Sequence, residues 1–311
     1  MFDTMMPSTQ VFEELKALLP ESVVRQSEPL ARRTTMRVGG CADVYLEPAS
    51  EAELSKAVQF FHQSERPFMI LGRGSNLLVR DGGVRGVVIC LCHPNLSRIE
   101  AEKPLLHCGA GARLKAVSAK ARELELAGLE FLEGIPGNVG GALRMNAGAM
   151  GGEMFKVITQ VRFLDAGGIV HQRNTADIPV EYRSCPFFQT NIALGATFRG
   201  EPEAKEAIAQ RTAQFNQKRW GSQPKEPSAG CIFKNPSPTL SAGKLIDELG
   251  LKGTRCGGAS VSMVHGNFII NNGNATASDV LQLITTIKAR ARSERGIELR
   301  TEVEIIGEEH G

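Results

Sequence analysis

The sequence predicts an α+β protein with mixed α/β lobes, and three observations lead to that prediction. Strand-like and helix-like apolar patterns alternate through the first third of the chain, as they do in α/β proteins. The middle third is dense in Gly, Pro and Asn and carries short strand-like runs. At 311 residues, 42% of them hydrophobic, the chain is longer than one core comfortably fills.

The N-terminal part is expected to alternate helix and strand. Apolar residues between Val11 and Leu19 fall on one helical face, and Pro20 ends that run. Ser50 and Glu53 form a capping box ahead of a second helix. Apolar runs then predict strands over 68–71 and 84–91, and a helical pattern follows over 114–126.

The rest of the chain predicts two further parts. Segment 128–200 is expected to form an α+β lobe with strands over 161–164 and 192–197. The polar, helix-prone segment 201–227 leads into a final part. That part is expected to hold helices over 241–249, closed by Gly250, and 278–292, and to end in a strand over 302–306. We therefore expect three lobes, covering 1–90, 91–200 and 201–311.

Charge and composition exclude several classes of function. Lys and Arg number 36 against 34 Asp and Glu, and the net charge of +2 gives no field that would draw in nucleic acid. No apolar run approaches the roughly 18 residues that span a bilayer, and the first ten residues lack a targeting pattern. The seven cysteines have neither CxxC spacing nor nearby His partners, so free thiols and no metal site are expected. We expect a cytoplasmic protein without nucleic-acid or membrane partners.

The strongest local pattern is a glycine turn over 71–78, which reads LGRGSNLL and directly follows an apolar strand. Backbone N–H groups and small polar side chains in such a turn suit a pyrophosphate. The turn lacks the third glycine of the GxGxxG dinucleotide fingerprint, because Leu77 stands at that position. From the residues alone, a purely structural turn explains the pattern equally well.

A second glycine cluster occupies 134–152 and reads GIPGNVGGALRMNAGAMGG. So many positions without side chains cost folding entropy, which tight turns or a closely approaching ligand would justify. With Gly109, Gly111 and the turn at Val38 and Gly39, the chain has at least four glycine-rich turns that could converge on one extended ligand. A dinucleotide would fit that footprint.

Six motifs occur in the order seen in UDP-N-acetylenolpyruvoylglucosamine reductases: LGRGSNLL, GIPGNVGGALRMNAGAMGGE, EYR, PSAGCIFKNP, AGKLID and TEVEIIG. The chain resembles this family over nearly its whole length. The resemblance implies an FAD-binding fold similar to the vanillyl-alcohol-oxidase/PCMH type, with two N-terminal lobes for FAD and a C-terminal α/β lobe for the substrate. It also implies noncovalent FAD, NADPH as co-substrate, a UDP-sugar enolpyruvyl ether as substrate and a role in peptidoglycan precursor synthesis. A monomer is expected.

The glycine turns and this resemblance together give the expected flavin contacts. They are Val38, Gly39, Gly72, Arg73, Gly74, Ser75, Asn76, Gly109, Gly111, Gly134, Ile135, Pro136, Gly137, Gly140, Gly141, Asn146 and Gly148. Two other classes of protein remain as alternatives: an FAD oxidase of the same fold, often with covalent flavin, and a flavin-binding protein without catalysis. Neither glycine cluster contains a histidine, which disfavours covalent attachment through that residue.

In the family that the chain resembles, NADPH reduces the flavin and leaves, and the substrate then takes a hydride from flavin N5 at C3 of its enolpyruvyl group. Negative charge passes into the carboxylate, so the reaction needs a fixed cation there and an acid near C2. The resemblance assigns the cation to Arg183, for which a surface arginine is the alternative, and the essential glutamate to Glu302. A strand over 302–306 would send Glu302 and Glu304 to the same face, which leaves Glu304 as an alternative.

The third catalytic position departs from the family pattern. The family places a serine proton donor at the end of the motif SAGS, whereas this chain reads SAGC and ends that motif with Cys231. A thiol with a reference pKa of about 8.5 can still deliver a proton at neutral pH. A buried structural cysteine is the alternative.

The resemblance also gives weaker expectations for the sugar nucleotide. Tyr182, Gln223, Lys234, Asn235 and His265 align with family positions near the substrate. A solvated residue on a polar loop is the alternative for His265. The short spacing between Arg183 and Cys231 indicates the type II branch of the family.

Overall fold

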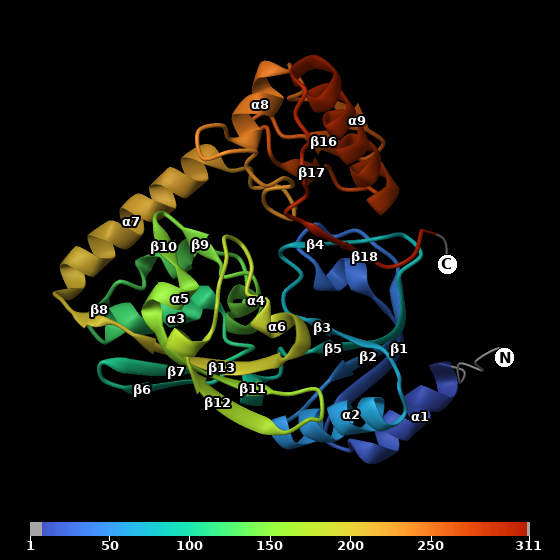
Figure 1. Ribbon diagram of the computed structural model, residues 1–311, viewed down its shortest axis with the longest axis vertical. Helices are drawn as coiled ribbons and strands as arrows, with labels where there is room; N and C mark the ends of the chain where they lie inside the picture. Colours follow the sequence, from blue (N-terminus) through green and yellow to red (C-terminus); the bar gives the residue numbers. More distant parts are fainter. Residues whose placement is uncertain (1–7, 310–311) are drawn as a thin grey trace. The chain divides into compact units, whose positions relative to one another are not determined.

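A computed structural model describes residues 8–309 and divides them into two compact units. The chain enters unit 2 three times, so both units are built from segments far apart in the sequence (Figure 1). The described parts of unit 1 are 8–27, 44–73 and 86–217, and those of unit 2 are 28–43, 74–85 and 218–309.

The helices and strands follow the expected order, with shifts of a few residues at their ends. The α-helices are α1 (Ser8–Leu18), α2 (Glu51–Gln63), α3 (Leu114–Glu123), α4 (Val139–Arg144), α5 (Met154–Val157), α6 (Phe187–Thr190), α7 (Lys205–Ser222), α8 (Ala242–Glu248) and α9 (Ala277–Arg295). Short 3₁₀ helices cover Leu30–Arg33, Pro94–Leu96, Glu130–Gly134 and Thr175–Asp177.

Within residues 8–309, the strands form six sheets. They are β1 (Val23–Pro29), β2 (Cys41–Glu47), β3 (Phe68–Leu71), β4 (Leu77–Val79), β5 (Val84–Cys90), β6 (Ile99–Glu102), β7 (Leu105–Gly109), β8 (Leu126–Ala127), β9 (Gly148–Ala149), β10 (Gly152–Glu153), β11 (Ile158–Leu164), β12 (Val170–Asn174), β13 (Ile192–Arg199), β14 (Glu201–Pro202), β15 (Arg255–Cys256), β16 (Ala259–Val261), β17 (Ile269–Asn271) and β18 (Glu304–Ile306). The expected alternation of strand and helix in the first third is confirmed.

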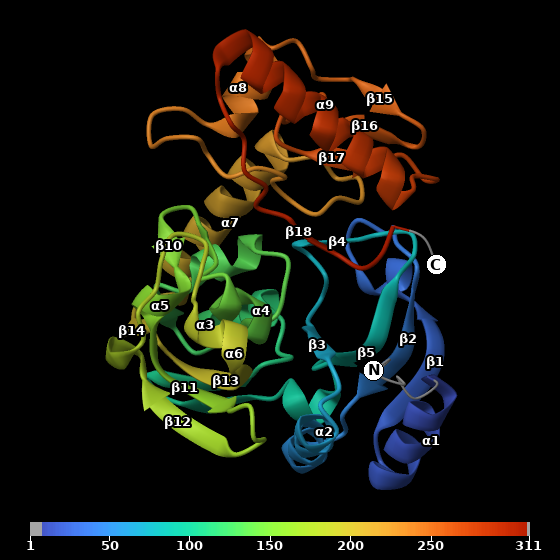
Figure 2. The same cartoon turned by 45° about the vertical axis from the view of Figure 1, so that its right-hand side comes forward.

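One sheet of unit 1 has the strand order β1-β2-β5-β3. Strands β3 and β5 run parallel, and Leu71 at the end of β3 pairs with Cys90. Helices α1 and α2 contact each other and bury Leu15 and Phe61 in one core with Ile89 of β5 (Figure 2). This packing fixes the position at which β3 ends and the glycine turn begins.

The expected capping box of α2 is half formed. The Ser50 hydroxyl caps the helix by accepting the backbone N–H of Glu53 at 3.2 Å. The buried Glu53 carboxylate instead accepts hydrogen bonds from the backbone of Glu21 and the hydroxyl of Ser22. Glu53 therefore holds the loop after α1, a long-range partner that local sequence spacing cannot indicate.

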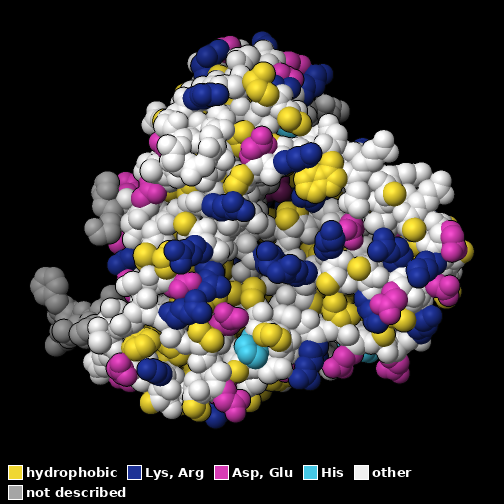
Figure 3. Space-filling model, turned by 180° about the vertical axis from the view of Figure 1, so that it is seen from behind, with side chains coloured by type: hydrophobic (Ala, Val, Ile, Leu, Met, Phe, Trp, Pro, Cys, Tyr) yellow, Lys and Arg dark blue, Asp and Glu magenta, His cyan; other side chains and the backbone are white. Residues whose placement is uncertain are grey.

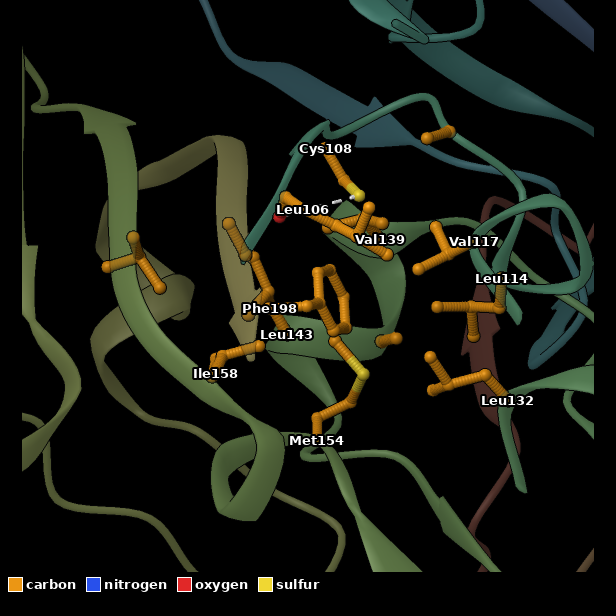
Figure 4. Packing of buried hydrophobic residues seen from close by; sticks show 14 of the residues in the cluster. Leu106, Cys108, Leu114, Val117, Leu132, Val139, Leu143, Met154, Ile158 and Phe198 are labelled. Carbon is orange, nitrogen blue, oxygen red and sulfur yellow. Dashed lines mark hydrogen bonds between the residues drawn. The ribbon is translucent and has the colours of Figure 1, made fainter. Parts of the chain in front are cut away.

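The second sheet of unit 1 is antiparallel throughout, with the order β12-β11-β13-β7-β6. Its core is shown in Figure 4, where the ring of Phe198 from β13 lies beside Met154 and Leu143. The Cys108 thiol donates to the Leu106 carbonyl at 3.9 Å, and burial raises the pKa of Cys108 to about 12. Cys108 is thus an inert core residue.

Unit 2 packs α8 and α9 against a small antiparallel sheet of β15, β16 and β17, and both ribbon views show α9 beside that sheet (Figures 1 and 2). Its core includes Ile284 of α9 together with Met36 and Leu78, which come from the two early segments of the unit. Strand β18 pairs in parallel with β4, and Ile305 lies opposite Leu78. The last strand and an early glycine-flanked strand thus share one core.

Within residues 8–309, no helix has the combined length and apolarity that crossing a membrane requires. On the face shown in Figure 3, hydrophobic side chains lie scattered among polar and charged ones, as on ordinary protein surfaces.

Candidate active site

The first glycine turn, 71–78, joins the two units, because 71–73 belong to unit 1 and 74–78 to unit 2. Gly74 has φ +58°, and a Cβ there would stand 2.6 Å from the Arg33 carbonyl oxygen. A Cβ on Gly72 would stand 2.6 Å from Oδ1 of Asn138. Protein packing therefore already requires both glycines, so their presence alone does not decide between a ligand and a structural turn. Arg73 and Ser75 flank Gly74 in the same turn.

The second glycine cluster gathers three parts of unit 1. Asn138 caps α4 by accepting the N–H of Gly141 at 3.2 Å, and the same side chain lies against Gly72. The N–H of Gly140 donates to the carbonyl of Ala110, which lies between Gly109 and Gly111. Within unit 1, the structure therefore brings the three expected glycine turns together.

Three other expected flavin contacts lie near the start of this second cluster. Another glycine turn lies in unit 2. Ile135, Pro136 and Gly137 connect the 3₁₀ helix that ends at Gly134 with α4, and the Gly137 carbonyl accepts the N–H of Leu114. In unit 2, Gly39 follows the buried Val38, and a Cβ on Gly39 would stand 2.5 Å from the Cβ of Val79. The turn at Val38 and Gly39 is therefore packed on the strand that follows Gly74.

Arg183 lies at the tip of a tight turn in unit 1. Two backbone hydrogen bonds, of 2.9 and 3.2 Å, join Glu181 and Ser184 across the turn. Arg183 has φ +58°, a left-handed conformation that residues with side chains adopt infrequently and that functional sites often retain. Its guanidinium carbon lies 5.2 Å from the ring centroid of Tyr182, whose side chain is 61% exposed.

The second glycine cluster holds this turn in place. Asn146, buried and at φ +38°, donates from Nδ2 to the Glu181 carbonyl at 3.3 Å and accepts the N–H of Phe155 at Oδ1. Gly148 provides space for the Arg183 guanidinium, because a Cβ on Gly148 would lie 3.3 Å from Nη1. Asn146 and Gly148, expected as flavin contacts, thus also position the expected cation.

Cys231 and Glu302 lie on neighbouring backbone segments of unit 2. The Glu302 N–H donates to the carbonyl of Ile232 at 2.8 Å. Asn76, from the first glycine turn, donates from its side-chain Nδ2 to the Glu302 carbonyl at 3.1 Å, and its backbone carbonyl accepts the Glu304 N–H. Strand β18 begins only at Glu304, so the expected alternation between Glu302 and Glu304 was wrong. Glu302 lies in the bend before the strand, and hydrogen bonds hold both its backbone N–H and its carbonyl.

Sequence reasoning missed Asn267, which fixes the segment after Cys231. Its side chain is 3% exposed, and both ends of its amide bind Phe233: Oδ1 accepts the N–H at 2.9 Å and Nδ2 donates to the carbonyl at 2.8 Å. The Asn267 carbonyl also accepts the Ile232 N–H. A polar amide next to the apolar run of 268–270 was the available indication, because buried amides need partners.

His265 has a structural role that sequence reasoning did not foresee. Its Nδ1 accepts the Asn267 N–H at 3.1 Å, and its ring contacts Phe268 edge-to-face at 4.9 Å. Burial, together with the nearby charge of Lys252, lowers the pKa of His265. The ring is therefore partly buried rather than solvated, and its contact with substrate stays a prediction.

The other residues expected near the sugar nucleotide also lie in unit 2, except Tyr182. Oδ1 of Asn235 accepts the N–H of Ala242 at the start of α8, at 3.1 Å. The N–H of Lys234 donates to the carbonyl of Arg300, and Gln223 follows the last turn of α7. These contacts fix the backbone near Cys231 without assigning a ligand.

Two thiols lie behind Gly72 in unit 1. The Sγ atoms of Cys90 and Cys92 both lie within hydrogen-bonding distance of the Gly72 carbonyl oxygen, at 3.9 and 3.8 Å. A hydrogen bond between the two thiols lowers the pKa of Cys90 and raises the pKa of Cys92. The two thiols therefore pack against the glycine turn at Gly72.

Comparisons with known proteins agree with this arrangement. Residues 42–173 match the family model described as "FAD binding domain", and residues 223–306 match "UDP-N-acetylenolpyruvoylglucosamine reductase, C-terminal domain". A UDP-N-acetylenolpyruvoylglucosamine reductase of Syntrophomonas wolfei is 40% identical over 96% of this chain and all of that protein. One from Bradyrhizobium sp. is 42% identical over 94% of this chain and 96% of that protein.

A solved structure gives the same result for the fold. The crystal structure of the reductase from Thermus caldophilus is 38% identical, with a TM-score of 0.78 over 92% of this chain and 99% of that one. The fold is therefore the FAD-binding type expected from the sequence, and the chain is a flavoprotein oxidoreductase by class. It belongs to the UDP-N-acetylenolpyruvoylglucosamine reductase family.

Proposed function

We propose that the chain reduces UDP-N-acetylenolpyruvoylglucosamine to UDP-N-acetylmuramate in peptidoglycan precursor synthesis, with noncovalent FAD and with NADPH as the electron source. The observation that carries this proposal is the 40% identity to a reductase of that name over 96% of this chain and the whole of the relative. The match covers the whole of the relative, so every domain of the relative has an aligned segment in this chain.

The residues present are suited to a flavin dinucleotide. The glycine turns around Gly72, Ala110 and Gly140 pack together and lie within the matched FAD binding domain. A buried hydroxyl, that of Thr34, lacks a hydrogen-bond partner among the described residues, and the Cα and methyl group of Thr34 pack against Gly74. A polar atom of this kind beside a glycine turn is what an absent phosphate-containing ligand would leave unsatisfied.

Bound FAD, once reduced by NADPH, would supply the hydride that adds to C3 of the enolpyruvyl group. Arg183 would then hold the substrate carboxylate, because its charged planar group offers paired donors to both oxygens. The turn geometry at φ +58° and the space beside Gly148 support this role, since both fix the direction of the side chain. A fixed cation stabilises charge that develops during reaction without reorganising.

Cys231 would donate the proton to C2, and Glu302 would orient the substrate or the donor. The hydrogen bond from the Glu302 N–H to the carbonyl of Ile232 supports this pairing, because it ties the residue after the thiol to the carboxylate-bearing residue. Asn76 and Asn267 hold the two segments from opposite sides of that bond. Such rigid positioning is required for efficient proton transfer.

One assay tests the proposal. Purified protein is mixed with NADPH and UDP-N-acetylenolpyruvoylglucosamine under anaerobic conditions while the absorbance of the nicotinamide is followed. Without substrate, we expect NADPH oxidation to stop after one equivalent per bound flavin. With substrate, it should continue and give one mole of UDP-N-acetylmuramate for each further mole of NADPH consumed. The control omits substrate and admits oxygen. Rapid NADPH oxidation with peroxide formation there, without turnover of the UDP-sugar, would contradict the proposal and favour an oxidase.

A further inference from the structure

Thr34 carries an unexplained hydroxyl in unit 2. The residue is 7% exposed, and its Oγ1 has no hydrogen-bond partner within residues 8–309. Buried polar side chains in folded proteins nearly always have a partner, so an unpaired one needs an explanation. The neighbouring Thr35 shows the ordinary case, because its hydroxyl donates to the Ser228 carbonyl at 2.7 Å.

The unpaired hydroxyl lies beside the first glycine turn. A Cβ on Gly74 would stand 2.8 Å from the Cα of Thr34 and 2.9 Å from its Cγ2, so the two backbones touch. The Thr35 N–H donates to the Gly74 carbonyl at 3.2 Å and locks the two segments together. Thr34 is therefore a direct neighbour of this turn, although the glycine pattern did not include it.

We infer that the Thr34 hydroxyl is a cofactor-binding group that donates a hydrogen bond to an oxygen of the FAD pyrophosphate. This inference rests on the proposed binding of FAD. A phosphate oxygen is the chemically suited acceptor, because a hydrogen bond to an anion is stronger than one to a neutral group. Binding would satisfy the hydroxyl that the protein alone leaves unpaired.

Two neighbouring substitutions separate this role from a structural one. Thr34→Val keeps the shape of the side chain and removes only the hydroxyl. The FAD-free protein should therefore unfold at an unchanged or higher temperature. The dissociation constant for FAD should rise by about 10-fold or more, the effect of losing a hydrogen bond to a charged group. Thr34→Ser keeps the hydroxyl and should bind FAD within about threefold of the parent, well below that loss.

Thr35→Val is the matched control. It removes a hydroxyl that the protein itself uses, so the FAD-free protein should unfold at a lower temperature. FAD release is measured by the rise in free-flavin fluorescence on diluting the full-length holoprotein. Unfolding is followed with and without added FAD. The two variants should therefore differ in which property they change. Thr34→Val weakens FAD binding without lowering the unfolding temperature of the FAD-free chain, and Thr35→Val lowers that temperature.

The possible outcomes distinguish the inference from the proposed function. A parent protein that holds no flavin would overturn both. A parent that holds FAD, with a Thr34→Val variant that holds it equally well, overturns the inference alone. A Thr34→Val variant that unfolds at a lower temperature without FAD also overturns it, because the hydroxyl would then have a partner within the protein.

Discussion

The guanidinium of Arg183 occupies space that Gly148 leaves open, since a Cβ on Gly148 would stand 3.3 Å from Nη1. Gly148 pairs with Glu153 across the short hairpin of β9 and β10. Asn146, two residues earlier, holds the turn that carries the arginine. The second glycine cluster and the expected cation therefore form one structural element of unit 1.

Arg183→Lys should separate the two halves of the reaction. Reduction of the flavin by NADPH should change little, whereas transfer from flavin to substrate should fall by about 10²-fold or more, because only that step develops carboxylate charge. Stopped-flow absorbance measures each half by itself. An equal loss in both halves would show that Arg183 serves nicotinamide binding or folding instead.

Cys231→Ser and Cys231→Ala should differ sharply. Serine keeps a proton donor of similar size and should retain substantial turnover, whereas alanine should lose at least about 10²-fold, as expected for general acid catalysis. Both variants should remain yellow, and NADPH should still bleach the flavin of the alanine variant. If that variant turns over within about threefold of the parent instead, Cys231 is not the donor.

Asn267→Asp should disturb the segment after Cys231. The carboxylate keeps an acceptor for the Phe233 N–H but places a second acceptor against the Phe233 carbonyl, which should cost about 1–3 kcal/mol of unfolding free energy. Transfer from flavin to substrate should slow while flavin reduction by NADPH is kept. Thermal unfolding and stopped-flow absorbance measure the two effects.

Asn271→Asp is the matched control for Asn267. Asn271 is also buried, and its Nδ2 donates to the Met36 carbonyl at 3.0 Å, away from Phe233. It should cost similar stability without the selective loss in the second half reaction. Equal kinetic losses in the two variants would mean that Asn267 acts on folding alone.

His265 should make stability depend on pH. Its pKa in the folded protein is lowered, chiefly by burial and also by the charge of Lys252, so folding favours the neutral ring. The stabilisation is therefore complete above the unfolded pKa of about 6.5 and is lost as pH falls through the lowered folded value. The temperature of unfolding should drop more for the parent than for His265→Asn between about pH 8 and about pH 5. Parallel curves for the two proteins would contradict this assignment.

Local patterns in the sequence predicted most of the longer helices and some of the strands, because short-range physics specifies those elements. The strand that ends at Leu71 is an apolar run stopped by a glycine, and the helix over 278–292 carries an apolar stripe that the core of unit 2 buries. The structure adds a capping box at Thr276 and Asp279 and a left-handed glycine, Gly296, at the end of that helix. Fold class and element order follow from such signals.

The features that the sequence did not predict depend on contacts between residues far apart in the chain. The partners of Asn267 and Thr34 are known only from the fold. The Asn267 amide binds both backbone groups of Phe233, and the Thr34 hydroxyl has no partner within residues 8–309. Motif order suggested Arg183, Cys231 and Glu302. Only the fold shows that the Ile232 carbonyl accepts a hydrogen bond from the Glu302 N–H. The expected lobes follow the chain in sequence, whereas the compact units interleave, and the assignment of function to each lobe stays a prediction.

The interleaving of unit 2 limits how this chain can be cut. A fragment covering 223–306, the length of the C-terminal family match, would lack Met36 and Leu78 from its own core and β4 as the partner of β18. Such a fragment would expose an unpaired strand edge and apolar surface, the conditions that favour aggregation. During synthesis, β4 stays without its partner until β18, which lies far later in the sequence, has left the ribosome. Chaperone dependence is therefore an expected property of this architecture.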